Sequence, residues 1–99
     1  MDRVMQFVLA HRFQKITLAE AAAEANLTKE AFCRFFKLRT RKTFTDYVLH
    51  LRINEAQKLL QETELSISEI GYRVGFENLS YFNRSFKRIA RMTPREVRG

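Results

Sequence analysis

Apolar residues recur at steps of three and four along most of this chain, which is the spacing of one face of an α-helix. The pattern predicts helices over Met1–Phe13, Leu18–Ala25, Lys29–Lys37 or slightly further, Phe44 to about Glu62, Ile67–Val74, Asn78–Arg91 and Arg95–Arg98. The sequence contains a single proline and three glycines, too few turn residues for a sandwich of many short strands. We therefore expect an all-α fold.

Polar residues mark where several of these helices begin. Three stretches have the spacing of a capping box, in which the first and fourth residues each bond the other's backbone N–H: Thr17–Glu20, Thr43–Asp46 and Ser66–Glu69. Thr93 followed by Pro94 is a further start, because proline is favoured at the first helical position. These starts separate short helices from one long helix, residues 44–62, which would span roughly 28 Å.

Two pairs of helices are each joined by a tight turn, which is the helix-turn-helix pattern. In the first pair Asn26 ends one helix and Thr28 caps the next, and in the second pair Gly75 and Asn78 take these places. Asn and Gly both tolerate the left-handed backbone that such a turn requires. The chain is therefore predicted to contain two helix-turn-helix units, in residues 1–43 and 63–99, connected by the long helix.

The two units also match residue by residue. Before the turn the matching residues are 49 apart: Thr17 with Ser66, Leu18 with Ile67, Glu20 with Glu69, Ala22 with Gly71, Ala25 with Val74 and Asn26 with Gly75. After the turn they are 50 apart: Arg34 with Arg84, Phe36 with Phe86, Lys37 with Lys87, Arg41 with Arg91 and Thr43 with Thr93. A shared fold explains the matching caps and turns. It does not require Arg34 and Arg84 at the same outer position.

The second helix of each unit is amphipathic in a way that suits a DNA groove. Its expected inner edge is aromatic: Phe32, Phe35 and Phe36 in the first unit, and Phe82, Phe86 and Ile89 in the second. Its expected outer face is polar: Glu30, Cys33, Arg34 and Lys37 in the first unit, and Ser80, Asn83, Arg84 and Lys87 in the second. With the long helix between them, two such recognition helices could contact successive major-groove segments, which repeat at about 34 Å.

The charge balance favours an anionic partner. The formal net charge is +7 with a pI near 10.1, and basic residues gather at both ends around an acidic middle, as expected for nucleic acid, anionic lipid or acidic protein. No apolar run approaches the roughly 20 residues of a membrane-spanning helix, and residues 1–13 do not form a signal peptide. The one cysteine, Cys33, permits no internal disulfide and fits a reducing cytoplasm. We expect no metal site and no cofactor.

The motifs of the second unit resemble those of the AraC/XylS family of bacterial transcription regulators. The stretch ISEIGYRVGFENLSYFNRSFKRIARMTPREVR is similar to that family's second-unit pattern, and FCRFFK and the helix from Leu51 to Leu60 also fit. The resemblance implies seven helices in two helix-turn-helix subdomains joined by a long helix, forming one domain over residues 1–99. It implies sequence-specific binding of double-stranded DNA, with RNA polymerase as a further partner. Family members usually carry a separate domain for effector sensing or dimerisation, so we expect a DNA-binding fragment or a short single-domain member.

The resemblance also assigns roles to individual residues. Base-facing positions would be Glu30, Cys33 and Arg34 in the first unit, and Leu79, Ser80, Asn83 and Arg84 in the second. Contacts to the DNA backbone would come from Thr17, Thr28, Lys29, Lys37, Arg41, Lys42, Asn78, Tyr81, Lys87, Arg88 and Arg91. The family commonly has glycine after each recognition helix, where this chain has Arg41 and Arg91. Either an arginine takes up that turn, at about 1 kcal/mol, or the helices end differently.

Several residues keep a second interpretation. Arg34 and Arg84 could read guanine or be solvated or phosphate-bound, Glu30 could accept from cytosine or stabilise the helix start, and Arg52 could reach phosphate or pair with an acid such as Glu55. Two other functions stay open at this point. A DNA-modifying enzyme would use Cys33 as its reactive group, and an RNA-binding or protein-binding helical domain would need exposed aromatics for RNA.

Overall fold

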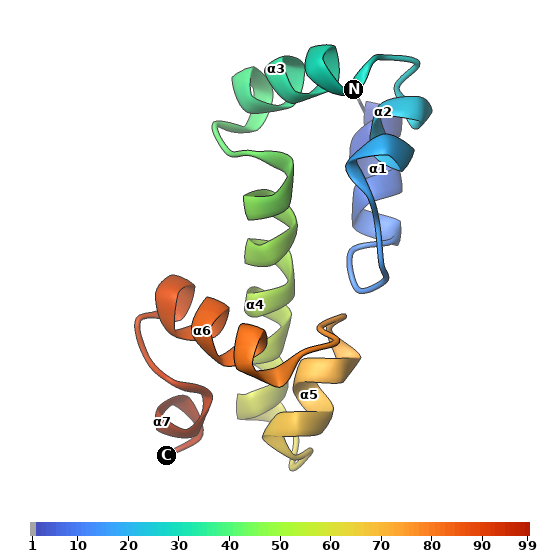
Figure 1. The fold of residues 1–99 in the computed structure, drawn as a ribbon. Coiled ribbons are helices and arrows are strands. Elements are labelled where there is room, and N and C mark those ends of the chain that lie inside the picture. Colours follow the sequence, from blue (N-terminus) through green and yellow to red (C-terminus); the bar gives the residue numbers. More distant parts are fainter. Residues whose placement is uncertain (1) are drawn as a thin grey trace. The chain divides into compact units, whose positions relative to one another are not determined.

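The computed structural model describes residues 2–99, and all of the regular structure in that range is helical. Figure 1 shows the seven helices in chain order: α1 (Asp2–Ala10), α2 (Leu18–Glu24), α3 (Lys29–Thr40), α4 (Phe44–Glu62), α5 (Ile67–Arg73), α6 (Leu79–Ala90) and α7 (Pro94–Arg98). The prediction of an all-α fold with seven helices is confirmed over this range. Within residues 2–99, no helix combines the length and the apolar character needed to cross a bilayer.

The chain divides into two compact units, Met1–Val48 and Leu49–Gly99. The boundary lies inside α4, whose first residues belong to the first unit and whose remainder belongs to the second. Each unit contains one complete helix-turn-helix pair, α2–α3 or α5–α6. Each unit also has a phenylalanine core of its own, and this core fixes the face that its recognition helix turns to solvent.

The core of the first unit is a cluster of aromatic rings beneath α3. Phe32 and Phe36 are fully buried, and their ring centroids lie 5.5 Å apart. The Phe36 ring contacts Phe44 edge-on at 5.6 Å and Tyr47 at 5.3 Å, both from the start of α4. Such tilted and edge-on pairs are the favoured aromatic geometry. The inner side of α3 is therefore held by ring contacts as well as by burial of apolar area.

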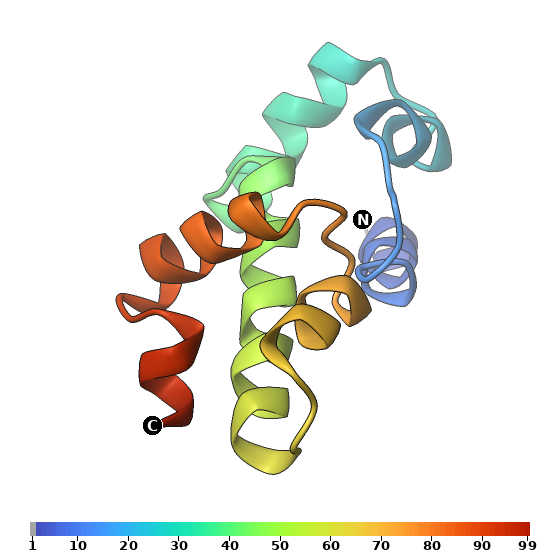
Figure 2. The same ribbon diagram turned by 60° about the horizontal axis from the view of Figure 1, so that its bottom comes forward.

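The second unit repeats this arrangement beneath α6. Phe82 and Phe86 are fully buried, together with Ile53 of α4 and Ile70 of α5. Phe76, from the turn between α5 and α6, is also buried, and its ring centroid lies 5.2 Å from that of Phe82. Figures 1 and 2 both show α5 and α6 alongside the later part of α4, where these residues meet.

Arg98 of α7 closes the far end of the second unit. Its guanidinium donates hydrogen bonds to the backbone carbonyls of Leu60 at 3.3 Å and Thr63 at 3.2 Å, and to the carbonyl of Leu65. The last carbonyls of a helix have no partner within it. One arginine thus satisfies carbonyls at and beyond the end of α4 and fastens α7 there.

Most helix ends follow the predicted caps, with differences of one to three residues. Predicted residues Ala25 and Val74 are the C-caps of α2 and α5. The helix α3 runs on to Thr40, past the predicted Lys37, and α1 stops at Ala10 instead of Phe13. The His11 ring lies 2.9 Å from the Phe7 carbonyl, and the Arg12 guanidinium donates to the Leu9 carbonyl. Side chains that bond the final carbonyls in this way end a helix, so polarity at 11–12 marked a stop. Met1 lies outside the described residues.

The capping boxes are only partly as predicted. The Thr17–Glu20 box is present in full. At both Ser66 and Thr43 the hydroxyl oxygen accepts from a backbone N–H at 3.1 Å. The Glu69 carboxylate lies 3.9 Å from the Arg73 guanidinium and does not complete the Ser66 box. Thr93 and Glu96 form a further complete capping box. The hydrogen bond that the Thr93 backbone N–H donates to the Glu96 carboxylate lowers the pKa of Glu96.

Arg41 and Arg91 settle how the two recognition helices end. Arg41 has φ 66° and Arg91 has φ 68°, so both lie in the left-handed region at the C-cap of α3 and α6. Their backbone N–H groups donate to the carbonyls of Lys37 at 2.8 Å and Lys87 at 2.9 Å, as in helix-ending turns that favour glycine. The first of the two alternatives is therefore correct: an arginine takes up the turn.

Arg91→Gly is expected to raise the free energy of unfolding by about 0.5–1 kcal/mol. Glycine removes the cost of a side chain at positive φ, about 1–2 kcal/mol, and returns part of it as extra freedom in the unfolded chain. Urea denaturation of both proteins measures the difference. Arg88→Gly, in helical backbone of α6, is the matched control and should destabilise by about 1 kcal/mol. A lower stability for Arg91→Gly would contradict the assignment of strain to this position.

Candidate nucleic-acid interface

The turns of the two helix-turn-helix pairs have the same backbone hydrogen bond. Leu27 donates to the Ala22 carbonyl and Phe76 donates to the Gly71 carbonyl, each at 3.0 Å. The residue before each donor has positive φ, 58° at Asn26 and 104° at Gly75. The predicted repeat therefore extends to the detailed geometry of the turn, which directs α3 and α6 away from α2 and α5 in the same way.

The start of each recognition helix is capped by a side chain from the predicted DNA-backbone set. Thr28 Oγ1 accepts from the Ala31 N–H at 3.1 Å, and Asn78 Oδ1 accepts from the Tyr81 N–H at 2.9 Å. The N-terminus of a helix carries a partial positive charge and free N–H groups, which suit a phosphate. The first turns of α3 and α6 lie at the surface of each unit, where Lys29, Glu30 and Ser80 are exposed.

The outer face of α6 carries the residues predicted to face DNA bases. Ser80, Asn83 and Arg84 are exposed, while the opposite side of the helix is buried through Phe82, Ser85 and Phe86. Leu79 differs because it is half-buried, and a Cβ atom on Gly71 would lie 3.0 Å from its Cδ2 atom. Part of Leu79 therefore packs on α5, where glycine lets the two helices approach closely.

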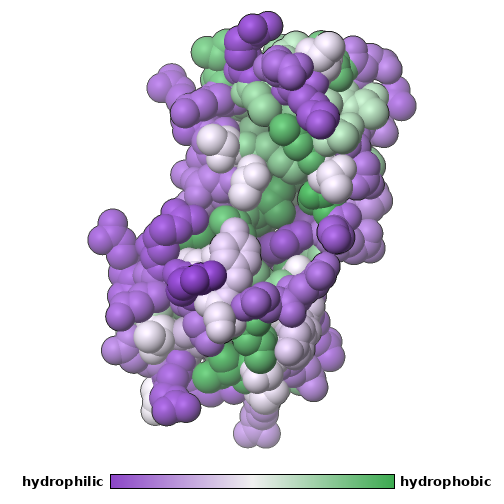
Figure 3. Space-filling model, in the orientation of Figure 1, coloured by the Kyte–Doolittle hydropathy of each residue, from purple (hydrophilic) through white to green (hydrophobic). Residues whose placement is uncertain are grey.

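The outer face of α3 likewise exposes Glu30, Cys33 and Arg34. One predicted inner residue is wrong: Phe35 is 45% exposed, although Phe32 and Phe36 are fully buried. Three phenylalanines at steps of three, four and one cannot all point at the same core, and Phe35 falls at its margin. Leu38 is 80% exposed and was not predicted as part of the surface. Figure 3 shows such hydrophobic surface, in green, among hydrophilic side chains around α3.

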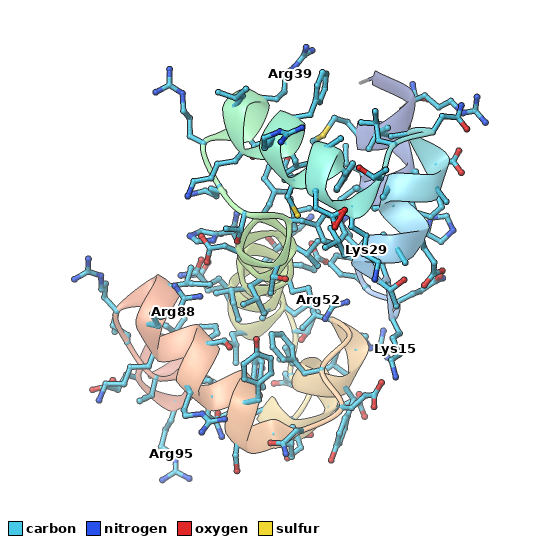
Figure 4. All side chains as sticks on the ribbon, turned by 45° about the horizontal axis from the view of Figure 1, so that its top comes forward. Lys15, Lys29, Arg39, Arg52, Arg88 and Arg95 are labelled. Carbon is cyan, nitrogen blue, oxygen red and sulfur yellow. The ribbon has the colours of Figure 1, made fainter. Side chains whose placement is uncertain are left out.

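The side chains predicted to meet the DNA backbone are mostly at the surface. In the first unit Lys29, Lys37 and Arg41 are exposed and Lys42 is half-buried, and in the second unit Tyr81, Lys87, Arg88 and Arg91 are exposed. Figure 4 labels Lys29 at the start of α3 and Arg88 on α6. Thr17 is exposed but already bonded, since its hydroxyl caps α2 and donates to the Glu20 carboxylate at 2.9 Å.

Sequence reasoning missed a hollow in the second unit whose lining is part polar and part apolar. It has a volume of about 460 Å³ and is lined by Ile67, Ser68, Asn83, Thr93, Pro94 and Arg95. Asn83 is one of the predicted base-facing residues, so the hollow continues the outer face of α6 toward the starts of α5 and α7. Arg95 is exposed and projects from α7 in Figure 4. The sequence feature that could have indicated this hollow is Arg95, a basic residue directly after Thr93-Pro94.

Arg52 has a contact that the sequence did not indicate. Its guanidinium donates to the Gly75 carbonyl at 3.4 Å and lies 5.8 Å from the centroid of the Phe76 ring. Burial lowers the pKa of Arg52, and the nearby Tyr81 acts in the opposite direction. Arg52 thus joins α4 to the turn that precedes α6.

Comparison with known proteins agrees with this geometry. Residues 21–99 match the model of a helix-turn-helix domain family. The chain is 36% identical over 94 residues to an uncharacterized HTH-type transcriptional regulator, YdeC, of Bacillus subtilis, and the match covers 95% of this chain and 32% of the relative. The chain therefore spans about a third of the length of that curated relative.

Two solved structures have the same fold. The C-terminal domain of the two-component response regulator yesN from Fusobacterium nucleatum is 29% identical with a TM-score of 0.93, covering 99% of this chain and 96% of that one. The DNA-binding domain of AdpA, a global transcriptional factor solved in complex with a target DNA, is 25% identical with a TM-score of 0.92, covering 98% and 87%. Both the family model and these likenesses confirm the resemblance inferred from the motifs. This chain belongs to the helix-turn-helix family of AraC-type DNA-binding domains.

Proposed function

We propose that this chain is the DNA-binding domain of a bacterial transcription regulator and binds double-stranded DNA sequence-specifically through α3 and α6. The observation that carries the proposal is that these two helices have the same buried and exposed residue types at matching positions. Each buries two phenylalanines and exposes an arginine at the matching position, Arg34 or Arg84. The similarity to a domain solved with its target DNA supports the same mode of binding here.

The proposed division of labour follows from the chemistry of the side chains. Arg84 and Arg34 donate two hydrogen bonds to guanine in the major groove, and Asn83 and Ser80 contact neighbouring bases. Lysine and arginine side chains near the ends of α3 and α6 neutralise phosphates and supply affinity that does not depend on sequence. Glu30, Cys33 and Leu79 complete the base-facing set with contacts of less directional character.

We further propose that residues 1–99 act as a single DNA-binding domain in the cytoplasm, with RNA polymerase as a partner of the bound protein. Effector sensing or dimerisation would belong to a domain outside this chain. The partner and the second domain are proposed from family membership, and the location is proposed from composition. The chain matches about a third of the length of these curated relatives.

Selection of bound duplexes from a random DNA library tests the proposal. A recovered site with two conserved blocks about 10 bp apart is expected, because one turn of B-DNA separates successive major-groove segments on one face. A single block would assign recognition to one dominant helix. Affinity for the recovered duplex should fall steeply between 50 and 200 mM salt, as phosphate neutralisation requires. Salt-independent affinity, or tighter binding of structured RNA competitor, would contradict the proposal.

A further inference from the structure

A row of two aromatic rings with a guanidinium at each end runs through the second unit to the outer face of α6. The Arg52 guanidinium lies 5.8 Å from the Phe76 ring, and the Phe76 ring meets Tyr81 edge-on at 5.7 Å. The Tyr81 ring in turn lies 6.0 Å from the Arg84 guanidinium. Distances up to about 6 Å between a guanidinium and a ring centroid are those of a cation–π contact. The row therefore connects α4 to the arginine best placed to read guanine.

Each inner member of the row is fixed by further contacts. Phe76 is 3% exposed, its N–H donates to the Gly71 carbonyl, and its ring also packs on Phe82. Arg52 is half-buried and donates to the Gly75 carbonyl. In Figure 4 its side chain extends from α4 toward the turn between α5 and α6. These residues form a rigid support beneath Tyr81.

The outer end of the row has the opposite character. Tyr81 is 40% exposed and Arg84 is exposed, so the ring is the main neighbour that can restrict where a long, flexible guanidinium goes. An arginine loses considerable side-chain freedom when it is ordered, and pre-organisation reduces that cost on binding. A ring three residues earlier on the same helix lies on the same side of α6 and can provide it.

We propose that Arg52, Phe76 and Tyr81 are positioning residues that hold the Arg84 guanidinium ready to read guanine. The inference rests on the proposed function. It also adds to the role expected of Tyr81, because the aromatic ring then contributes in addition to any contact of the hydroxyl with phosphate. It also makes the two units unequal, because Ala31 occupies the position of Tyr81 in α3 and offers Arg34 no ring.

The decisive comparison is between Tyr81→Phe and Tyr81→Leu. Phenylalanine keeps the ring and removes the hydroxyl, whereas leucine removes the ring. Affinity is measured for the selected duplex and for a copy in which the guanine contacted by Arg84 is replaced. We expect Tyr81→Phe to keep the wild-type preference for guanine. Tyr81→Leu should reduce it by about two- to five-fold, the effect of one exposed cation–π contact, and should have no effect on that preference in an Arg84→Ala background.

Three results would overturn the inference. Tyr81→Phe could lower the guanine preference as much as Tyr81→Leu, which would assign the effect to the hydroxyl. Tyr81→Leu could weaken every duplex equally. The Tyr81→Leu effect could also persist without Arg84. If the wild-type chain selects no duplex at all, the proposed function itself fails, and that outcome is distinct because no variant is needed to see it.

Arg52 is tested by the salt dependence of binding. Arg52→Met should reduce the guanine preference about as much as Tyr81→Leu and leave the slope of log affinity against log salt unchanged. A phosphate contact would instead lower that slope by about 1 and weaken all duplexes together, which would overturn the positioning role. Arg52→Lys keeps the charge and serves if the methionine variant does not fold. Because lysine lacks the planar guanidinium, it should also lose guanine preference with an unchanged slope, and wild-type preference in a folded Arg52→Lys protein would contradict the inference.

Discussion

Replacing Arg84 with alanine is expected to weaken binding to the selected duplex by roughly 5- to 150-fold, since a good bidentate pair with guanine contributes about 1–3 kcal/mol of discrimination. The loss of affinity should depend on one base pair, the one that contains the contacted guanine. Duplexes that already lack the contacted guanine should bind the variant and the wild type nearly equally, apart from a general loss of one positive charge. Arg84 is exposed on α6, so the substitution should leave the fold intact.

A fluorescence titration over a panel of single-base-pair variants of the site measures this pattern. Arg73→Ala is the matched control, because Arg73 is an exposed arginine of the same unit that lies on α5 and faces Glu69. It removes the same charge and should lower affinity evenly across the panel. If Arg84→Ala also lowers affinity evenly, Arg84 contacts phosphate and the specificity of the second unit must come from Ser80 and Asn83.

The sequence allowed the architecture to be predicted because its local signals agree with one another. Asn26 and Gly75 occupy matching turn positions, and both have the positive φ that their residue types tolerate. Thr28 and Asn78 then cap the following helices as their side chains predict. Capping and turn chemistry depend on neighbours within a few residues, so they can be read without knowing the packing.

Details that depend on packing could not be predicted in the same way. Phe35 and Phe36 have the same residue type and point about 100° apart on α3, and the rings of α4 that pack on Phe36 place the core on its side of the helix. The left-handed backbone of Arg41 and Arg91 is set by the repeat and not by the residue type. For Arg52 the sequence suggested a phosphate or an acid such as Glu55, but its guanidinium also donates to the carbonyl of Gly75, 23 residues away.

The contacts that position the candidate site are of this second kind. The exposure of Ser80, Asn83 and Arg84 on one face of α6 was predictable from steps of three and four along one helix. The ring of Phe76 beneath Tyr81 was not, because it arrives from a turn and is itself fixed by α4 and α5. Residue type and spacing identify which side chains lie on the outer face. The tertiary structure determines how firmly each one is held.

Phe36→Ala is expected to lower the free energy of unfolding by about 3–5 kcal/mol, whereas Phe35→Ala on the next residue should cost well under half as much. Both changes remove the same atoms from the same helix. Phe36 is fully buried with rings from Phe32, Phe44 and Tyr47 around it, so alanine leaves a cavity in addition to the lost transfer free energy. Phe35 is 45% exposed, and water can fill the space that its ring leaves.

Urea denaturation followed by circular dichroism compares the two variants, and Phe86→Ala provides the matching change in the second unit. A chain of this size has only about 5–15 kcal/mol of stability in total, so Phe36→Ala should remove a large share of it and unfold at a much lower urea concentration than Phe35→Ala. Equal losses would mean that Phe35 contributes to the core and that its exposure in the structure is wrong. A small loss for both would mean that the first unit tolerates a cavity beneath α3, and the ring cluster would then not be what fixes the outer face of that helix.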